Sequence, residues 1–139
     1  MKFILISLTL ALASITASAA DLEFPIRKVA DGDTISTNLK IPCPLCNVSV
    51  RIIGIDTPES TYLAKCQAEL AKGLAAKAFL TNFVIGHPTM TISKFKWDKY
   101  GGRIDAVVII NGINVGDEMI RQGFATPYTG TGPKPDWCS

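Results

Sequence analysis

The chain has 139 residues, with 14 lysines and arginines against 12 aspartates and glutamates, for a formal net charge of +2. This length suits one domain with a single hydrophobic core. A charge so close to zero excludes a strongly basic or strongly acidic protein, so any surface for a charged partner must be local.

Residues 1–19 have the pattern of a secretory signal peptide. Met1-Lys2 is a short basic start, residues 3–15 are almost entirely apolar, and Ala17-Ser18-Ala19 places small residues at the cleavage positions. The apolar run is shorter than the roughly 18 residues that indicate a membrane span, although an uncleaved anchor is the alternative. We therefore expect a periplasmic or secreted protein, with one domain over residues 20–139 and no membrane attachment after cleavage.

Short β-prone runs make up much of the remaining sequence. They lie at residues 24–30, 34–37, 48–55, 89–97 and 103–110. Asp31-Gly32 predicts a tight turn between the first two runs. Pro58 follows the third run, where a sheet ladder must stop because proline has no N–H to donate. In the fourth run the apolar positions change face between Ile92 and Phe95, which predicts a β-bulge.

One long helical pattern follows the third run, and Ser60 or Thr61 is placed to cap its N-terminus. The expected apolar face consists of Leu63, Cys66, Leu70, Leu74, Ala75 and Ala78, with Lys65, Glu69 and Lys72 on the opposite face. This helix should end before Gly86. A second, short helix is predicted over residues 115–122, after the hairpin signal Asn111-Gly112 and before Gly123.

These elements predict an α+β fold. We expect a small five-stranded Greek-key β-barrel of the OB type, with a long helix after the third strand and a short C-terminal helix. From about residue 126 onward an extended tail is expected. We expect Trp97 in the core and Trp137 to dock the tail on the barrel. Barrels of this type bind oligonucleotides or oligosaccharides, but the fold alone does not name the ligand.

Four cysteines are candidates for disulfide bonds, because export leads to an oxidising compartment. They are Cys43, Cys46, Cys66 and Cys138. Half a zinc site or a redox motif is the alternative for Cys43 and Cys46, although a zinc site would need a second close pair. Four cysteines allow three pairings, and the sequence does not choose among them. A bond to Cys138 would fix the tail.

Two short strings combine four carboxylates with one arginine. They are Asp31-Gly32-Asp33-Thr34 and the run from Arg51 to Glu59, which contains Asp56. Carboxylates at strand ends suit a hard metal ion, and an arginine can bind a phosphate opposite that ion through paired hydrogen bonds. This combination suggests a phosphodiesterase. The alternative is that Asp31-Gly32-Asp33 is a simple hairpin turn and Asp56 an Asx turn before the helix.

Together with Asp98-Lys99-Tyr100-Gly101 and Arg103, the two strings resemble the thermonuclease (staphylococcal nuclease) family, in order from about Val29 to Tyr128. The resemblance implies that Asp33, Asp56 and the backbone carbonyl of Thr57 bind Ca²⁺, supported by Asp31; that Arg51, Glu59 and Arg103 are catalytic; and that Lys99, Tyr100 and Tyr128 hold the substrate. In this reading Glu59 orients or deprotonates the attacking water. Its alternative is a carboxylate that interacts with a helix N-terminus.

The sequence departs from the family pattern at several places. Gly102 separates Arg103 from Tyr100-Gly101, where the family places the arginine directly after Tyr-Gly. A glycine bulge would return the guanidinium to the site, and this is the interpretation that we favour; a displaced arginine is the alternative. The linker of residues 38–48 is longer than the family's shorter versions, and the chain stops soon after Tyr128, without room for a C-terminal helix.

We expect an exported, Ca²⁺-dependent nuclease that acts on DNA and RNA, prefers single strands and leaves 3′-phosphate ends. It should be a monomer without a stable protein partner. One alternative is a catalytically weak OB-type module that binds single-stranded nucleic acid. Another is an exported interaction protein that keeps the fold for stability. Four carboxylates facing a polyanion argue against simple binding unless a cation lies between them.

Overall fold

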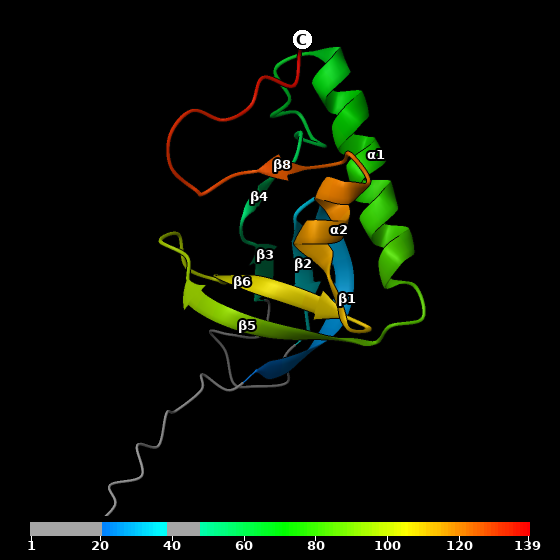
Figure 1. The fold of residues 1–139 in the computed structure, drawn as a ribbon, viewed down its shortest axis with the longest axis vertical. Helices are drawn as coiled ribbons and strands as arrows, with labels where there is room; N and C mark the ends of the chain where they lie inside the picture. Colours follow the sequence, from blue (N-terminus) through cyan, green and yellow to red (C-terminus); the bar gives the residue numbers. More distant parts are fainter. Residues whose placement is uncertain (1–20, 39–47) are drawn as a thin grey trace, which may run out of the picture.

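A computed structural model of the chain describes residues 21–38 and 48–139 (Figure 1). The expected signal peptide and the pair Cys43 and Cys46 lie outside the described residues. The strands are β1 (Leu22–Asp31), β2 (Thr34–Thr37), β3 (Ser49–Ile52), β4 (Ile55–Asp56), β5 (Thr89–Trp97), β6 (Arg103–Ile110), β7 (Ile113–Asn114) and β8 (Thr126–Pro127). The helices are α1 (Gln67–Val84) and α2 (Val115–Arg121). The predicted α+β order is confirmed.

Five strands close into a barrel, as the sequence predicted. Antiparallel pairing joins β3, β2, β1, β5 and β6 in that order, and a parallel pairing of β3 with β6 completes the circle. In this parallel pair Ser49 lies opposite Arg103, and Arg51 lies opposite Asp105. Alternate residues of β6 are buried, as expected for a strand with one face toward a core.

The barrel interior is filled mainly by β-branched side chains. Among the fully buried ones are Ile35, Val48, Val50, Ile52, Ile92, Val108 and Ile110, together with Leu80 of α1 and Met119 of α2. Such side chains suit the pleated surface of a strand because their χ1 angles are already restricted. The core therefore lies between the barrel strands and the two helices, and the charged side chains of the strand ends are left at its rim.

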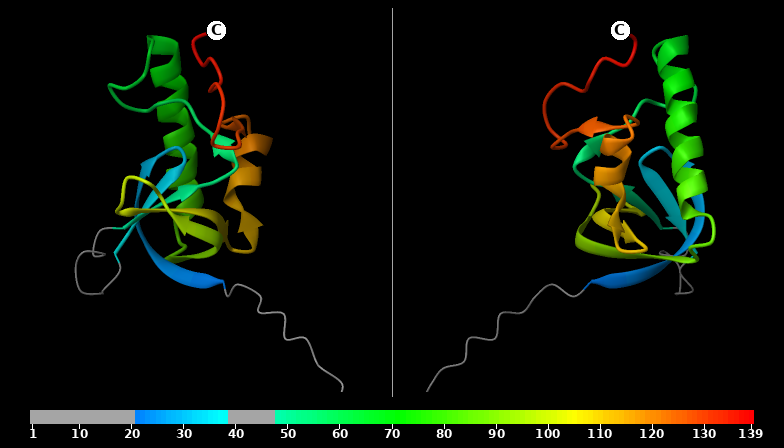
Figure 2. Two further views of the ribbon diagram at one scale, coloured as in Figure 1. Left: turned by 90° about the vertical axis from the view of Figure 1, so that its left-hand side faces the viewer. Right: turned by 45° about the vertical axis from the view of Figure 1, so that its right-hand side comes forward.

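The prediction for the long helix was right at its C-terminal end, before Gly86, but wrong in start, cap and face, since the helix begins at Gln67. Its N-cap is Cys66, whose Sγ accepts a hydrogen bond from Glu69 N at 3.3 Å. Residues on the buried face are Glu69, Gly73, Ala76 and Leu80, whereas Leu74, on the predicted apolar face, is 51% exposed. The helix uses small residues on its buried face because α1 packs closely along the barrel and the segment before it (Figure 2).

The bulge predicted in the fourth run is present in β5. The pairing of β5 with β6 shifts between Ser93 and Lys96, and Lys94 has a φ of 48°. Beyond this bulge the strand leaves the core, so the prediction that Trp97 is a core residue was wrong: its side chain is 55% exposed. The predicted Asn111-Gly112 hairpin joins β6 to β7, with positive φ at both residues.

The C-terminal tail returns to the barrel and then to the start of α1. Strand β8 pairs with β4, so Thr126 lies opposite Asp56. The last residues run beside the N-terminal end of α1 (Figure 1), where Cys138 Sγ lies 2.09 Å from Cys66 Sγ, within disulfide bonding distance. No helix within residues 21–38 and 48–139 is long and apolar enough to cross a membrane.

Candidate active site

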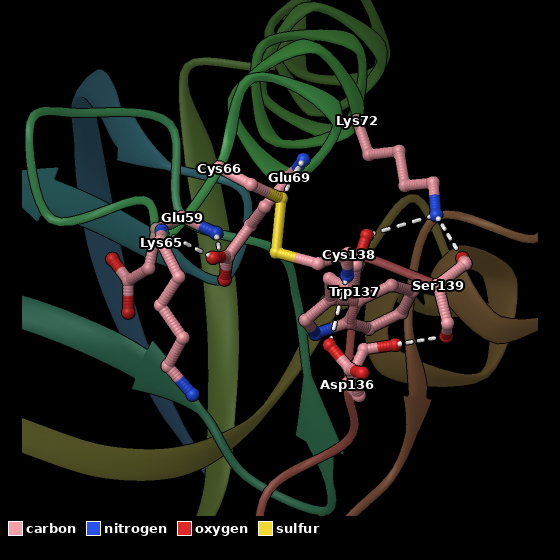
Figure 3. Close-up of a disulfide and its surroundings, with 9 residues drawn as sticks. All are labelled: Glu59, Lys65, Cys66, Glu69, Lys72, Asp136, Trp137, Cys138 and Ser139. Carbon is pink, nitrogen blue, oxygen red and sulfur yellow. Dashed lines mark hydrogen bonds between the residues drawn. A yellow bond between two sulfur atoms is a disulfide. The ribbon is translucent and has the colours of Figure 1, made fainter.

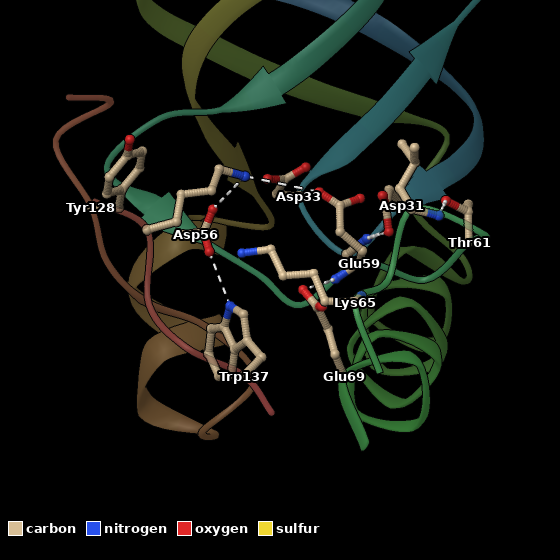
Figure 4. A network of polar contacts seen from close by, with 12 residues as sticks. Asp31, Asp33, Asp56, Glu59, Thr61, Lys65, Glu69, Tyr128 and Trp137 are labelled. Carbon is tan, nitrogen blue, oxygen red and sulfur yellow. Dashed lines mark hydrogen bonds and ion pairs between the residues drawn. The ribbon is translucent and has the colours of Figure 1, made fainter. Parts of the chain in front are cut away.

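The two acidic strings predicted from the sequence meet at one end of the barrel. Gly32 is the point of contact between them: a Cβ atom there would lie 3.0 Å from Thr57 Oγ1 and 3.1 Å from Ala76 Cβ. A larger residue at this position would require Thr57 or Ala76 to shift by a few tenths of an ångström. The close approach therefore brings the carboxylates of both strings to a common region, close to the start of α1 (Figure 4).

Asp33 and Arg51 form the centre of this region. Asp33 lies just before β2, and its carbonyl accepts a hydrogen bond from Ile52 N at 2.8 Å, which ties it to β3. Arg51 Nη1 lies 2.7 Å from Asp33 Oδ2, and Thr34 Oγ1 donates to Asp33 Oδ1 at 2.8 Å. Burial raises the pKa of Asp33, and the Arg51 charge opposes this only in part.

Asp56 and Thr57 supply the second half of the region. Asp56 is 1% exposed and Thr57 is 6% exposed. The β4–β8 pairing holds the backbone of Asp56. The Asp56 charge, like that of Asp31, raises the pKa of Asp33 further, so the carboxylates are close enough to repel one another. A cation placed among them would relieve this repulsion.

Asp31 forms hydrogen bonds within the first string and to the second. Its Oδ1 accepts hydrogen bonds from Ser60 Oγ at 2.6 Å and from Gly32 N at 2.8 Å. Ser60 is buried. This carboxylate therefore links the turn of the first string to the residue that follows Glu59 in the second. These hydrogen bonds hold the two strings together.

Glu59 lies in the segment that precedes α1 rather than in the helix. Its backbone N–H points to Glu69 Oε1 at 3.5 Å, and Lys65 N donates to Glu69 Oε2 at 2.7 Å. The buried Glu69 side chain thus holds this segment in place, and Gly73 of α1 packs against the backbone of Glu59. The Glu59 side chain remains 30% exposed. Burial, together with the Asp31 charge, raises the pKa of Glu59, which favours its action as a proton acceptor.

Arg103 is bonded to the hairpin that precedes it. Its Nε donates to Asp98 Oδ2 at 2.8 Å, and its Nη2 contacts the same oxygen. Burial works against ionisation of Asp98, but the hydrogen bonds from Tyr100 N and Arg103 outweigh it and lower the pKa of Asp98. Gly101 and Gly102 both have positive φ, a conformation that glycine adopts without strain. Within the described ranges, no ion pair joins Arg103 to Asp33 or Asp56.

The three predicted substrate residues fall in two places. Lys99 Nζ and Arg103 Cζ lie 5.0 and 5.9 Å from the centre of the Tyr100 ring, forming a cationic and aromatic cluster at the β5–β6 hairpin. Tyr128 lies beyond β8, where its backbone N–H donates to Gly54 O at 2.9 Å and its hydroxyl to Gly132 O at 3.1 Å. The structure therefore places Tyr128, and not the hairpin cluster, beside the strand of Asp56.

Two tail residues that sequence reasoning did not assign to the site contact Asp56. Lys134 Nζ lies 3.0 Å from Asp56 Oδ1 and 3.8 Å from Glu59 Oε1. Trp137 Nε1 donates to Asp56 Oδ2 at 3.0 Å (Figure 4). Burial lowers the pKa of Lys134, but the Asp56 carboxylate more than reverses this and the pKa is raised. The prediction that Trp137 docks the tail is confirmed. In the sequence, the only indication that Trp137 docks the tail was its position next to Cys138.

The donor set is compatible with a hard divalent cation. Asp33 and Asp56 offer buried carboxylate oxygens, and the lysine ammonium against Asp56 shows that this position accepts a positive charge. Among the residues that the structure describes, no three histidine, cysteine, aspartate or glutamate side chains form a complete cage. Hard cations also accept backbone carbonyls, water and substrate oxygens as ligands, so the protein need not supply every ligand as a carboxylate.

Comparisons with known proteins identify the family of this chain. The profile of the family described as Staphylococcal nuclease homologue matches residues 49–136. A probable endonuclease of Schizosaccharomyces pombe is 38% identical over 104 residues, which cover 66% of this chain and 44% of that protein. An uncharacterized endonuclease of Escherichia coli O157:H7 is 29% identical over 124 residues, or 88% of this chain and 72% of the relative.

A third relative, endonuclease YhcR of Bacillus subtilis, is 30% identical over 118 residues, which cover 81% of this chain and 9% of that protein. The chain thus spans less than half of the yeast relative and a small part of the Bacillus one. The matched segment includes β3, the second acidic string, α1, the hairpin with Arg103, and the tail as far as Asp136. The chain belongs to the staphylococcal nuclease homologue family.

Proposed function

We propose that the chain is an exported nuclease that uses Ca²⁺ to hydrolyse phosphodiester bonds of DNA and RNA. One observation carries the proposal: the Arg51–Asp33 pair, 2.7 Å apart, lies in the same region as buried Asp56 and half-buried Glu59. Nucleases of this family generally depend on a metal ion, and the relatives named as endonucleases support the same class of reaction.

Asp33, Asp56 and the backbone carbonyl of Thr57 are the groups that would hold the ion. When bound, Ca²⁺ would supply positive charge against the phosphate oxygens, where negative charge grows during hydrolysis. Asp31 would act only through its hydrogen bonds to Ser60 and Gly32, which keep the two strings together. The choice of Ca²⁺ over other hard cations follows from the family resemblance.

Arg51 would bind the phosphate from the side of the barrel. Its Nη1 contacts Asp33, and the remaining guanidinium N–H groups are the donors that it could direct to phosphate oxygens. Arginine remains charged at any working pH, so its donors need no pH tuning. Because Asp33 holds one end of the guanidinium, the donors are fixed before the substrate arrives, which is the arrangement that stabilises a growing charge best.

Glu59 would accept a proton from the attacking water. Its raised pKa lies nearer to neutrality than that of an ordinary glutamate, and its side chain is accessible at the edge of the site. The water oxygen then bonds to phosphorus, and the bond from phosphorus to the 5′-oxygen breaks. The 5′-oxygen takes up a proton, leaving a 5′-hydroxyl on one product and a 3′-phosphate on the other.

The substrate would continue from the site toward one or both groups of aromatic residues. Tyr128 is the nearer group, and the Lys99–Tyr100–Arg103 cluster offers two cations and a ring for a more distant nucleotide. Bases stack on aromatic rings without regard to sequence, and only unpaired bases expose their faces. We therefore infer a preference for single strands, bound by a monomer without a protein partner.

A gel assay separates this proposal from its alternatives. The chain without residues 1–19 is incubated with heat-denatured DNA, in calcium or in chelator. Degradation in calcium alone supports the nuclease. A retarded but intact band supports a module that only binds single strands, and no effect on the DNA in either condition supports an interaction protein.

A further inference from the structure

Both carboxylate oxygens of Asp56 are contacted by the C-terminal tail, a segment some 80 residues away in the sequence. Trp137 Nε1 donates to Oδ2 at 3.0 Å across a separation of 81 residues, and Lys134 Nζ lies 3.0 Å from Oδ1. Asp56 itself is 1% exposed. The tail therefore supplies a polar contact to each oxygen of this carboxylate.

The two tail contacts differ in how firmly they are held. The Lys134 side chain is 48% exposed, and a lysine ammonium group is carried on a long stem with many rotamers. Trp137 is half-buried, and its backbone carbonyl accepts a hydrogen bond from Lys72 Nζ at 2.9 Å. The Cys66–Cys138 pair adds a covalent link at the next residue, so Trp137 is anchored to the N-terminal end of α1 by two bonds (Figure 3).

We propose that Trp137 is a positioning residue for Asp56, and that the Cys66–Cys138 disulfide keeps it in place. This inference rests on the metal site of the proposed function. A fixed N–H on Oδ2 sets the plane of the carboxylate and leaves Oδ1 to Lys134, whose ammonium group also lies 3.8 Å from Glu59 Oε1. Lys134 is a mobile cation that an ion can replace, whereas the indole is a neutral donor that stays.

Partners of this kind that orient a ligand generally change metal affinity by about 10–100-fold when they are lost. The indole N–H contacts the ligand carboxylate and neither the substrate nor the reacting water. Its removal should therefore alter calcium binding more than it alters the fold. Loss of the disulfide should act in the same direction, because it releases the residue next to Trp137 from α1.

The test compares Trp137→Phe with Trp97→Phe, a matched control on the exposed face of β5. Calcium affinity is measured by isothermal titration calorimetry on protein purified without reductant, and the melting temperature is measured in chelator. We expect Trp137→Phe to weaken calcium binding by about tenfold or more, with Trp97→Phe unchanged. A Cys66→Ser, Cys138→Ser double variant should also bind calcium more weakly than the wild type.

A purely structural role would instead lower the melting temperature in chelator and leave calcium affinity unchanged, and that result would overturn the inference while the proposed function stands. If the wild type itself binds no calcium, both the inference and the proposed function fail.

A second measurement avoids the need for a Trp137 variant. In Trp97→Phe the only tryptophan is Trp137, so calcium binding at Asp56 should change its fluorescence. Emission that is unaffected by saturating calcium would contradict the proposed link between Trp137 and the metal site.

Discussion

Gly73 lies directly against the backbone of Glu59: a Cβ atom at Gly73 would come within 2.2 Å of the Glu59 carbonyl oxygen and 2.8 Å of the Pro58 carbonyl oxygen. No real side chain tolerates such a contact. The position of the proposed general base therefore depends on a missing side chain in the middle of α1, and on the buried Glu69 carboxylate beside it.

Gly73→Ala should consequently damage both stability and activity. The added methyl group must displace α1 or the Glu59 segment, and overpacking of this kind costs about 1–3 kcal/mol. Urea denaturation measures the free energy of unfolding, and the nuclease assay measures the rate. The neighbouring Leu74→Ala is the control, since Leu74 is 51% exposed and its loss should change stability little. A Gly73→Ala protein as stable and active as Leu74→Ala would contradict the close packing.

Arg51→Ala should lower kcat/KM by about 10²–10³-fold, the usual effect of removing a preorganised donor to a transition-state charge. Arg51→Lys should recover only part of this loss, because an ammonium group cannot make paired hydrogen bonds. Arg121→Ala serves as the control: Arg121 is 68% exposed and pairs only with Glu118 on α2 in the described part of the chain. Equal rates for Arg51→Ala and Arg121→Ala would exclude Arg51 from phosphate binding.

The Asp98–Arg103 pair should stabilise the hairpin in a pH-dependent way. The pKa of Asp98 is lowered from its ordinary value of 3.8 in the folded chain. The unfolded chain therefore takes up this proton first as the pH falls, so the stabilisation is complete above about pH 5 and is lost below the ordinary pKa. Asp98→Asn should be less stable than wild type at pH 7, and the difference should shrink toward pH 3.

Chemical denaturation at several pH values tests this expectation, with Asp21→Asn as the control, because Asp21 is exposed and lies just before β1. A difference between Asp98→Asn and wild type that is constant from pH 7 to pH 3 would show that the ionised carboxylate contributes nothing. The same variant reports on Arg103, since loss of activity at pH 7 would mean that the hairpin presents the guanidinium to the substrate.

Lys134→Gln should tighten calcium binding. The ammonium group lies 3.0 Å from Asp56 Oδ1, the oxygen that an ion would also require, so lysine and metal compete. A half-exposed ion pair is worth about 0–1 kcal/mol, which corresponds to at most a roughly fivefold gain in affinity. Calorimetric titration measures the calcium affinity, with Lys96→Gln on the exposed part of β5 as the control. Weaker binding by Lys134→Gln than by Lys96→Gln would contradict competition at Asp56.

The local parts of the fold were predictable from the sequence. Strand alternation, the Asn111-Gly112 turn and the phase change in β5 all depend on neighbouring residues, and the structure has each of them. The predicted face of α1 was wrong for a reason that periodicity cannot express. The helix packs through Gly73 and Ala76, where the small side chains permit close approach, whereas the periodic pattern gave more weight to the larger Leu74.

The site was predictable as a set of residues but not as a network. The resemblance named the carboxylates and Arg51, and the structure brings them to one end of the barrel. The contacts of Lys134 and Trp137 with Asp56 depend on the path of a tail without regular structure, which no short-range pattern determines. The Asp98 partner of Arg103 was missed because both residues were assigned to the hairpin separately.

Cleavage of a 5′-labelled single-stranded DNA oligonucleotide tests the central claim most directly. The chain without residues 1–19 is incubated with the oligonucleotide in calcium or in chelator, and the products are run with and without phosphatase treatment. We predict fragments in calcium alone, with a mobility that changes on phosphatase treatment because each carries a 3′-phosphate. An oligonucleotide that stays intact in calcium, or that is cleaved equally in chelator, would contradict a calcium-dependent nuclease.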